Sequence, residues 1–212
     1  GVPCGYEILD TFTPQYISEL ISWGAIGART TESQVHRQLV SGLSMPVGFK
    51  NGSSGDIEIA RDAILSSSFP HCFYGINKNG EAAIVETKGN KNTHLILRGS
   101  KYGTNYDIRS LKETVEILEK ANIRPNIMVD CSHGNSGKDY RNQHFVLEYT
   151  ISNIQKSIDL VMGFMIESNL VEGNQKLVFG EKDKLDWGKS ITDSCIGLEE
   201  TDYLLGSLYN TL

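Results

Sequence analysis

The chain has 212 residues, of which 39% are hydrophobic and 22% are charged, a composition typical of a globular domain with a substantial core. Its formal net charge of -6 and pI near 5.4 exclude a general nucleic-acid or acidic-membrane surface, because such a surface needs a basic face. Any anion must therefore bind at a local site.

Along the whole chain, short β-branched or apolar runs alternate with longer amphipathic segments, which is typical of βα units on a parallel sheet. The predicted strands are residues 2–9, 25–29, 46–50, 94–98, 127–131 and 161–167. The predicted helices are residues 14–22, 32–41, 56–66, 106–121, 139 to about 155, and 199–208. Thr13-Pro14 and Asn105-Tyr106 are the expected capping positions of two of these helices.

One segment departs from this alternation. Two β-rich runs, 72–76 and 82–85, flank an Asn-Lys-Asn-Gly sequence, and Asn79-Gly80 favours a tight hairpin turn. We predict an inserted β-hairpin over about residues 71–87, outside the main sheet. Residues 179–187 are predicted to form an exposed loop, and residues 1–212 to form a single domain, because no repeat or linker interrupts them.

The four cysteines, at positions 4, 72, 131 and 195, have neither the density nor the paired spacing of a disulfide scaffold or a structural zinc site. We therefore expect free thiols in a reducing compartment. No apolar run reaches the roughly 18 residues that a membrane span requires, and the first residues do not resemble a signal peptide. A cytoplasmic protein that binds neither membrane nor nucleic acid is expected.

Six βα units fit either an open doubly wound sheet or an incomplete eight-stranded barrel. A barrel collects functional groups after many strands, whereas a doubly wound sheet concentrates them at one switch point. Here nearly every predicted strand ends near a group of functional type: Arg29, Lys50, Arg98, His133 and Glu167. We therefore predict an α/β fold that is part of a (β/α)8 TIM barrel.

A metal site is the first candidate. His133, Glu167 and Asp193 follow one another at intervals of about one βα unit, so successive strand ends can bring them to one ion. Imidazole and carboxylate ligands suit a divalent metal such as manganese, iron, cobalt or zinc. For His133 the alternative is a hydrogen-bonded loop histidine, whereas Glu167 follows an apolar run, where a buried carboxylate needs a partner. Cys131 shares the strand face of His133, but we expect it to pack in the core.

An anion site is the second candidate. Arg29, Lys50 and Arg98 each follow an apolar strand and are flanked by glycine or hydroxyl residues, which allow a ligand to approach closely. Three cations on one rim would bind a phosphorylated or carboxylated small molecule. The alternative is a set of isolated surface cations that pair with neighbouring acids. The remaining histidines are expected on the surface or in the core: His36, His71, His94 and His144.

Several strings carry a family resemblance: GAIGARTTESQ (24–34), PVGFKNG (46–52), ILRG (96–99), DCSHGN (130–135), ESN (167–169) with EGNQ (172–175), and GKSITD (188–193). In this order they closely resemble the microbial class I DAHP synthases (3-deoxy-D-arabino-heptulosonate 7-phosphate synthases), and the resemblance runs from residue 1 to the C-terminus. It implies a (β/α)8 barrel enzyme, a transferase. The implied reaction condenses phosphoenolpyruvate with erythrose 4-phosphate to DAHP and phosphate, the first step of the shikimate pathway.

The resemblance also implies roles for single residues. The metal would polarise the erythrose aldehyde as a Lewis acid, the enol carbon would attack it, and water would add before phosphate leaves. The implied metal ligands are His133, Glu167 and Asp193; the implied phosphoenolpyruvate ligands are Arg29, Lys50 and Arg98; and the implied catalytic residues are Lys50, His133 and Glu7.

The chain also departs from the family pattern. The family's first barrel strand supplies a cysteine ligand and its second a Lys-Pro-Arg-Thr segment, and the chain contains neither. We expect it to begin at about the third strand and to represent a truncation, a proteolysis product or an incomplete gene model. Cys131 stands where relatives usually carry an aromatic residue, and Leu198 stands where a tryptophan is common.

Feedback control by an aromatic amino acid is the family's other trait. The resemblance places the effector near the hairpin, in a pocket made by Pro14, Gln15, Ser44, Phe73 and Gly75. Gly75 stands where phenylalanine-sensitive relatives tend to have serine, which favours tyrosine. The family also suggests a homo-dimer or homo-tetramer.

Two other functions stay open. The chain is either the enzyme described above or a non-catalytic remnant that folds only with another chain, because an unclosed barrel exposes sheet edges and core. A barrel hydrolase that uses the same metal is the third hypothesis, and it would release phosphate without erythrose 4-phosphate.

Overall fold

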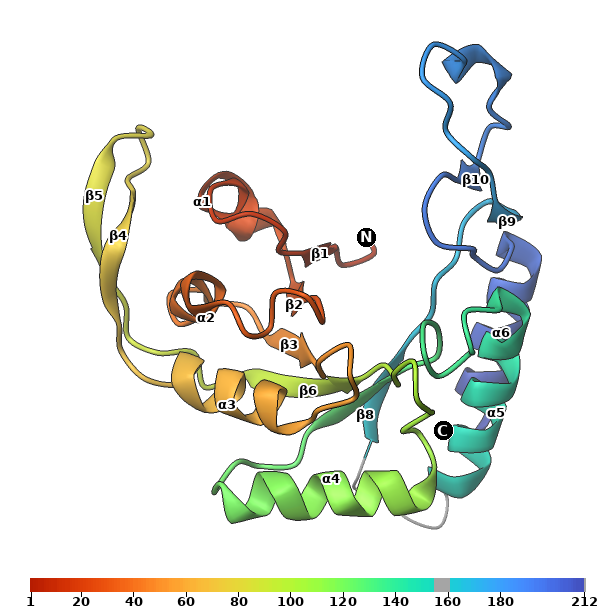
Figure 1. Cartoon of the computed structure of the whole chain (residues 1–212), viewed down its shortest axis with the longest axis horizontal. Coiled ribbons are helices and arrows are strands. Elements are labelled where there is room, and N and C mark those ends of the chain that lie inside the picture. The colour runs from red at the N-terminus through yellow and green to blue at the C-terminus, as the bar shows by residue number, and fades with distance from the viewer. Residues whose placement is uncertain (155–160, 212) are drawn as a thin grey trace.

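The computed structural model describes residues 1–154 and 161–211. Its main sheet has six parallel strands, in the order β1 (Gly5–Glu7), β2 (Trp23–Ile26), β3 (Val47–Lys50), β6 (Thr93–Leu97), β7 (Ile127–Asp130) and β8 (Val161–Met165). The strand order follows the chain and never reverses, so the sheet has no switch point. It curls into a half-barrel with β1 and β8 at its edges (Figure 1), which confirms the predicted partial barrel.

The helices flank the outer side of this sheet (Figure 1). They are α1 (Thr13–Ile17), which continues as the 3-10 turn η1 (Ser18–Leu20), α2 (Gln34–Val40), α3 (Glu58–Ser67), α4 (Ile108–Lys120), α5 (Gln143–Ile154), preceded by η2 (Tyr140–Asn142), and α6 (Leu198–Thr211). The expected end of the fifth helix near Gln155 lies outside the described residues. Among the described residues, no helix has the length and apolar character needed to cross a bilayer.

Both predicted helix caps are wrong. Thr13 is the first residue of α1, and the free N–H groups of Phe12 and Thr13 donate to Asp10 Oδ1 over 2.8 and 2.7 Å. Helix α4 begins two residues later than the cap at Asn105 predicts, because Asp107 accepts a hydrogen bond from the Ser110 backbone N–H at 3.1 Å. In both places an aspartate satisfies the free donors of the first turn.

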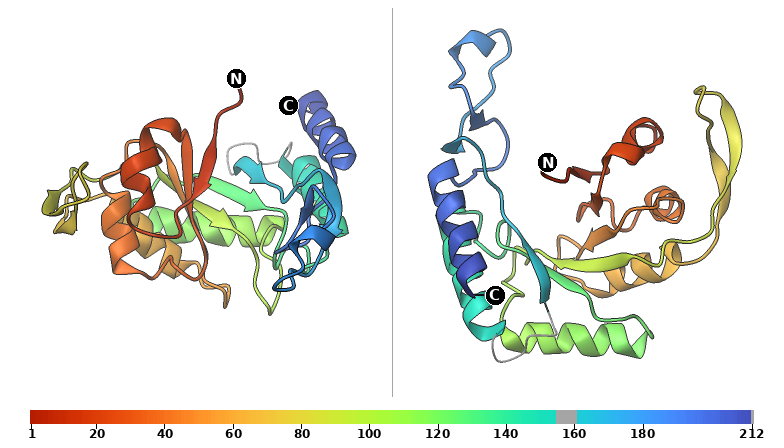
Figure 2. Two further views of the ribbon diagram at one scale, coloured as in Figure 1. Left: turned by 90° about the horizontal axis from the view of Figure 1, so that it is seen from above. Right: turned by 180° about the vertical axis from the view of Figure 1, so that it is seen from behind.

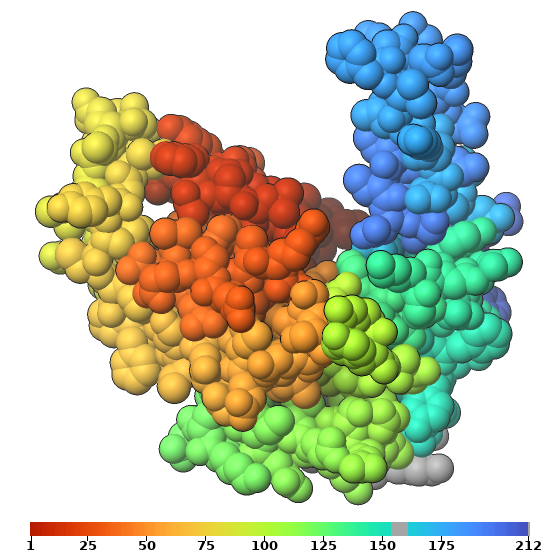
Figure 3. All heavy atoms as spheres, viewed as in Figure 1, coloured from red at the N-terminus to blue at the C-terminus, as the bar shows by residue number. Residues whose placement is uncertain are grey.

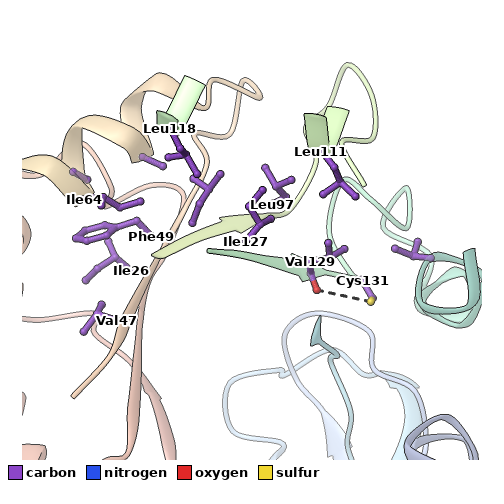
Figure 4. Close-up of a cluster of buried hydrophobic side chains, with 14 of the residues drawn as sticks. Ile26, Val47, Phe49, Ile64, Leu97, Leu111, Leu118, Ile127, Val129 and Cys131 are labelled. Carbon is purple, nitrogen blue, oxygen red and sulfur yellow. Dashed lines mark hydrogen bonds between the residues drawn. The ribbon is translucent and has the colours of Figure 1, made fainter. Parts of the chain in front are cut away.

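The core lies between the central strands and the helices. All four residues of β3 and all five of β6 are buried, as expected for central parallel strands, which are covered on both faces. Figure 4 shows Phe49 and Leu97 from the sheet together with Ile64 of α3 and Leu118 of α4. Cys131 is also fully buried, which confirms its expected place in the core, and burial raises the pKa of its thiol.

The predicted hairpin is confirmed. Strands β4 (Cys72–Ile76) and β5 (Ala82–Glu86) pair antiparallel in a sheet of their own. The hairpin rises beside α1 (Figure 1), and Lys78 Nζ at its turn lies 3.9 Å from Glu19 Oε1. A Cβ placed on Gly80 would lie 3.3 Å from the Tyr16 hydroxyl, so the hairpin tip contacts the α1 region.

A short parallel pair, β9 (Val171–Asn174) and β10 (Lys189–Ser190), was not predicted. The residues between the two strands include η3 (Lys182–Lys184) and form an arm that projects from the body (Figure 3). Phe179 and Trp187 are exposed in this arm, which confirms the predicted loop over residues 179–187. The arm and the hairpin lie on opposite sides of the molecule (Figure 2).

Candidate functional site

A cavity of about 650 Å³ opens at the carboxyl ends of the strands. Parallel strands of a barrel present these ends on one rim, which is where barrel enzymes place their chemistry. The cavity walls include every residue that the sequence predicts for metal, substrate or catalysis: Glu7, Arg29, Lys50, Arg98, His133, Glu167 and Asp193. The fold therefore brings together residues from nearly the whole length of the chain.

The three predicted metal ligands lie on one side of this cavity, which we call the acidic wall (His133, Glu167 and Asp193). His133 Nε2 lies 3.4 Å from Glu167 Oε1 and 3.9 Å from Asp193 Oδ2, and one ligand atom of each residue lies within 4.8 Å of the other two. One imidazole nitrogen and two carboxylate oxygens are a donor set that fits a divalent transition metal.

The acidic wall has the electrostatics of a cation site. Burial raises the pKa of the Glu167 carboxyl; the charges of Asp130 and Asp193 act in the same direction, while His133 and Lys50 oppose them. Neighbouring carboxylates that repel one another are stabilised by a bound cation. His133 is held in the left-handed backbone region, at φ 55°, a conformation that non-glycine residues adopt mainly where the surroundings require it.

Asp130 is the functional residue that sequence reasoning missed. Its side chain is fully buried, and Oδ2 lies 3.0 Å from Lys50 Nζ and 2.9 Å from His133 Nδ1. Oδ1 accepts hydrogen bonds from the Ser132 backbone N–H at 2.9 Å and the Ser132 hydroxyl at 2.7 Å. Asp130 ends an apolar strand, and a buried carboxylate needs a partner, so the signal that indicates Glu167 is present at Asp130 as well.

This carboxylate orients the histidine. Burial alone would raise the pKa of Asp130, but its contacts with His133 and Lys50 lower that pKa well below its usual range, so the group is ionised. The Ser132 hydroxyl lies 2.6 Å from His133 Nδ1 and donates its proton to Asp130 Oδ1, so it accepts the Nδ1–H of the histidine. The lone pair is then on Nε2, which faces Glu167 and Asp193. Asp130 thus contacts both His133 of the acidic wall and the ammonium group of Lys50.

A second group of residues that line the cavity, which we call the cation wall, consists of Arg29, Lys50 and Arg98. Lys50 is buried and paired with Asp130, Arg98 is half-buried, and Arg29 is exposed. In the described part of the chain, neither guanidinium has a carboxylate at ion-pair distance. Both arginines are therefore free to bind an anion, and the alternative of surface cations that pair with neighbouring acids does not describe them.

Two further features complete the cavity. The Glu7 carboxylate lies against Gly27, where any Cβ would overlap Oε1, so the glycine gives this side chain its place at the rim. Lys138 also lines the cavity, at φ 64°, and no pattern in the sequence indicated it.

The other histidines lie outside this cavity. His94 is buried in β6 and accepts a hydrogen bond from Trp23 Nε1 at 3.1 Å, and burial lowers its pKa to about 4. His36 contacts Ser33, His71 contacts a backbone carbonyl of α3, and His144 lies near Glu148 and Glu200. They are core or surface histidines, as predicted.

The predicted effector residues lie at a second place. Pro14 is buried in α1, Gln15 is exposed on the same helix, and Ser44 is exposed after α2. Phe73 and Gly75 are partly buried on β4, which stands beside α1 (Figure 1).

Comparison with known proteins gives one consistent family. The chain matches the family model described as DAHP synthetase I family over residues 1–206. It is 51% identical over its full length to the Phe-sensitive phospho-2-dehydro-3-deoxyheptonate aldolase of Escherichia coli (strain K12), and 47% identical to the Tyr-sensitive one, and it covers 60% and 59% of those relatives.

A solved structure of phospho-2-dehydro-3-deoxyheptonate aldolase from Francisella tularensis SCHU S4 superposes on it with a TM-score of 0.94 at 49% identity, over 99% of this chain and 60% of that one. The chain thus spans about three fifths of the length of these relatives.

Proposed function

Because the chain belongs to the DAHP synthetase I family, we propose that it forms the metal- and phosphoenolpyruvate-binding part of an enzyme that condenses phosphoenolpyruvate with erythrose 4-phosphate. One observation carries this proposal. Three cations and three metal-ligand side chains, from different strand ends, line a single cavity. A substrate that carries a phosphate and a carboxylate would bind to the cations, and its reaction would take place beside a metal held by the acidic wall.

The cation wall would bind phosphoenolpyruvate. Guanidinium groups bind phosphate and carboxylate in a bidentate manner, and neither Arg29 nor Arg98 forms an ion pair with another described side chain. Lys50 is held beside Asp130, so its ammonium is fixed at the cavity wall before a substrate binds. A fixed cation adds little ordering cost on binding.

The acidic wall would hold a divalent metal (manganese, iron, cobalt or zinc) through His133, Glu167 and Asp193. When bound, such a metal supplies Lewis-acid polarisation of the erythrose 4-phosphate aldehyde. Asp130 keeps His133 Nε2 turned toward the two carboxylates.

Proton transfers fall to the chain's own residues. Carbon–carbon bond formation leaves an alkoxide on the former aldehyde, and the Lys50 ammonium at the cavity wall would donate the proton to it. Water then adds to the former enol carbon and loses a proton, which the Glu7 carboxylate at the rim would accept. Loss of phosphate from that carbon completes the reaction.

We also propose feedback control by an aromatic amino acid, with tyrosine favoured, and assembly as a homo-dimer or homo-tetramer. The effector would bind between α1 and the hairpin, at Pro14, Gln15, Ser44, Phe73 and Gly75. Relatives support a regulated enzyme, since their names include Phe-sensitive, Tyr-sensitive and, for a 51% identical protein of Candida albicans, tyrosine-inhibited forms. The preference for tyrosine rests on Gly75, where a Cβ would lie 2.8 Å from Val85 Cγ2, so a serine at this position would require Val85 to shift.

The experiment joins the N-terminal part of the E. coli Phe-sensitive relative, which the chain does not match, to Gly1. We expect loss of phosphoenolpyruvate absorbance that requires both erythrose 4-phosphate and a divalent metal. Phosphate release without erythrose 4-phosphate would instead identify a hydrolase. A folded fusion that consumes no phosphoenolpyruvate under any of these conditions would leave the non-catalytic remnant as the correct description.

A further inference from the structure

Three buried asparagines lie in the segments that follow β3, β6 and β7, which also carry residues of the cavity. Asn51, Asn105 and Asn135 are 0%, 9% and 4% exposed, and none of them takes part in the proposed chemistry. Asn51 follows β3, Asn105 lies in the loop after β6, and Asn135 lies in the loop after β7. Burying an amide side chain costs free energy unless each of its polar atoms forms a hydrogen bond. Three buried amides at one place therefore need an explanation.

Asn51 uses its full hydrogen-bonding capacity. Its Oδ1 accepts from the Arg98 backbone N–H at 2.8 Å and from Asn105 Nδ2 at 3.2 Å. Its Nδ2 donates to the carbonyls of Gly52 at 2.9 Å and Gly99 at 3.2 Å. An amide side chain offers two acceptor sites and two donors, and all four are used here.

The other two asparagines close the network. Asn105 Oδ1 accepts from the Gly99 backbone N–H at 2.8 Å, and the Asn105 backbone N–H donates to Asn135 Oδ1 at 2.9 Å. Asn135 Nδ2 donates to the carbonyls of Leu97 at 3.1 Å and Asp130 at 2.9 Å.

Hydrogen bonds satisfy every backbone polar group of one dipeptide, Arg98-Gly99. The N–H groups of Arg98 and Gly99 donate to Asn51 and Asn105, and the Gly99 carbonyl accepts from Asn51. The Arg98 carbonyl accepts from the backbone N–H groups of Gly134 at 3.0 Å and Asn135 at 3.2 Å. Gly99 takes φ 67°, and a Cβ on it would lie 2.6 Å from Asn135 N, so the two loops touch.

Strand β6 ends at Leu97, so the backbone of Arg98 has no neighbouring strand to pair with. The asparagine side chains form the hydrogen bonds that such a strand would otherwise form. The Arg98 side chain reaches the cavity without an ion pair to any described residue, so its direction depends on its backbone. Asn51 is also the neighbour of Lys50, and Asn135 lies two residues after His133. The same network of buried asparagines therefore adjoins Lys50, Arg98 and His133 in the chain.

We propose that Asn51, Asn105 and Asn135 are positioning residues for the substrate anion. They fix the backbone of Arg98 so that its guanidinium stands in the cavity before phosphoenolpyruvate arrives, which reduces the ordering cost of binding. The inference rests on the proposed function, because it takes Arg98 to be a ligand of phosphoenolpyruvate.

The test uses Asn51→Ala in the fusion with the N-terminal part of the relative. We expect the KM for phosphoenolpyruvate to rise roughly tenfold or more, while the KM for erythrose 4-phosphate changes less than about threefold. Amide hydrogen exchange at Arg98 and Gly99 should accelerate. Asn105→Ala, on the loop, is the second variant if Asn51→Ala does not fold, and it should change the same quantities in the same direction.

Asn90→Ala is the matched control. Asn90 is 3% exposed, its Nδ2 donates to the Met45 carbonyl at 3.0 Å, and its Oδ1 accepts from the Asn92 N–H at 2.9 Å, but it lies at the opposite ends of the strands. We expect its melting temperature to fall without a change beyond about twofold in the KM for phosphoenolpyruvate.

The outcomes separate the two proposals. An unmodified fusion that consumes no phosphoenolpyruvate overturns the proposed function, and this inference with it. An active fusion in which the folded Asn51→Ala or Asn105→Ala variant loses stability as Asn90→Ala does, with an unchanged KM for phosphoenolpyruvate, shows a purely structural network and overturns this inference alone.

Discussion

The two walls of the cavity are built in different ways. On the cation wall, Lys50 is 7% exposed and paired with a buried aspartate, and the backbone of Arg98 is held by buried asparagines. On the acidic wall, the Glu167 and Asp193 side chains are 26% and 74% exposed and lie in loops after β8 and β10. Lys50 and Arg98 are thus positioned by the fold itself, whereas the carboxylates of the acidic wall are more exposed, and in the proposed function a bound ion would hold them together.

The largest effect is expected at the acidic wall. His133→Ala removes the only nitrogen among the three described ligands, and we expect metal content, measured by elemental analysis, to fall to background. The control is His144→Ala, because His144 faces Glu148 and Glu200 outside the cavity. Unchanged metal stoichiometry in His133→Ala would remove His133 from the ligand set.

Asp130→Asn tests the connection between the walls. Removing the charge leaves Lys50 buried without its counter-ion, so we expect the free energy of unfolding to fall by about 3 kcal/mol in urea titrations. Metal affinity should fall about 10- to 100-fold, because the orienting partner of His133 is weakened. The control, Asp139→Asn, removes a partly exposed carboxylate paired with Arg141 and should change neither quantity noticeably. Equal behaviour of the two variants would contradict the role given to Asp130.

At the cation wall, Arg98→Ala should weaken phosphoenolpyruvate binding and leave metal content unchanged. Loss of charge-assisted hydrogen bonds predicts a rise in the KM for phosphoenolpyruvate of about 10- to 100-fold. Arg124→Ala is the control, since Arg124 is an exposed arginine at the opposite end of the strands. An unaltered KM and turnover in Arg98→Ala would count against this assignment.

The most gradual effect concerns the strand that leads to Arg98, because it develops only as the pH falls. Burial lowers the pKa of His94 from its ordinary value of 6.5 to about 4. Between pH 6.5 and pH 4, His94 is therefore protonated in the unfolded chain but not in the folded chain. Stability is therefore complete above pH 6.5 and decreases as the pH falls toward 4, by up to about 3 kcal/mol. Urea midpoints at pH 7, 5 and 4 measure this loss, and a His94→Gln variant with the same pH dependence would disprove it.

Much of this molecule could be predicted from its sequence because the central strands are continuous apolar runs that end in polar groups. That pattern located all six strands of the sheet and the residues of both walls, although Arg29, Arg98 and Glu167 lie in loops beyond the strands predicted to contain them. The pair of β9 and β10 was missed because a two-residue strand such as Lys189–Ser190 depends on tertiary contacts rather than on local propensity. The asparagine network was missed for a related reason, since the role of a buried amide depends on which backbone groups the fold places around it.

In the proposed function, a metal and phosphoenolpyruvate occupy one cavity, the metal at the acidic wall and phosphoenolpyruvate at the cation wall. Paramagnetic broadening of the phosphorus resonance of phosphoenolpyruvate by bound manganese, measured on the fusion protein, tests it directly. We predict strong broadening in the unmodified protein, and its loss in His133→Ala because manganese no longer binds and in Arg98→Ala because phosphoenolpyruvate binds weakly. If both ligands bind and the phosphorus resonance stays sharp, the two walls do not serve one reaction.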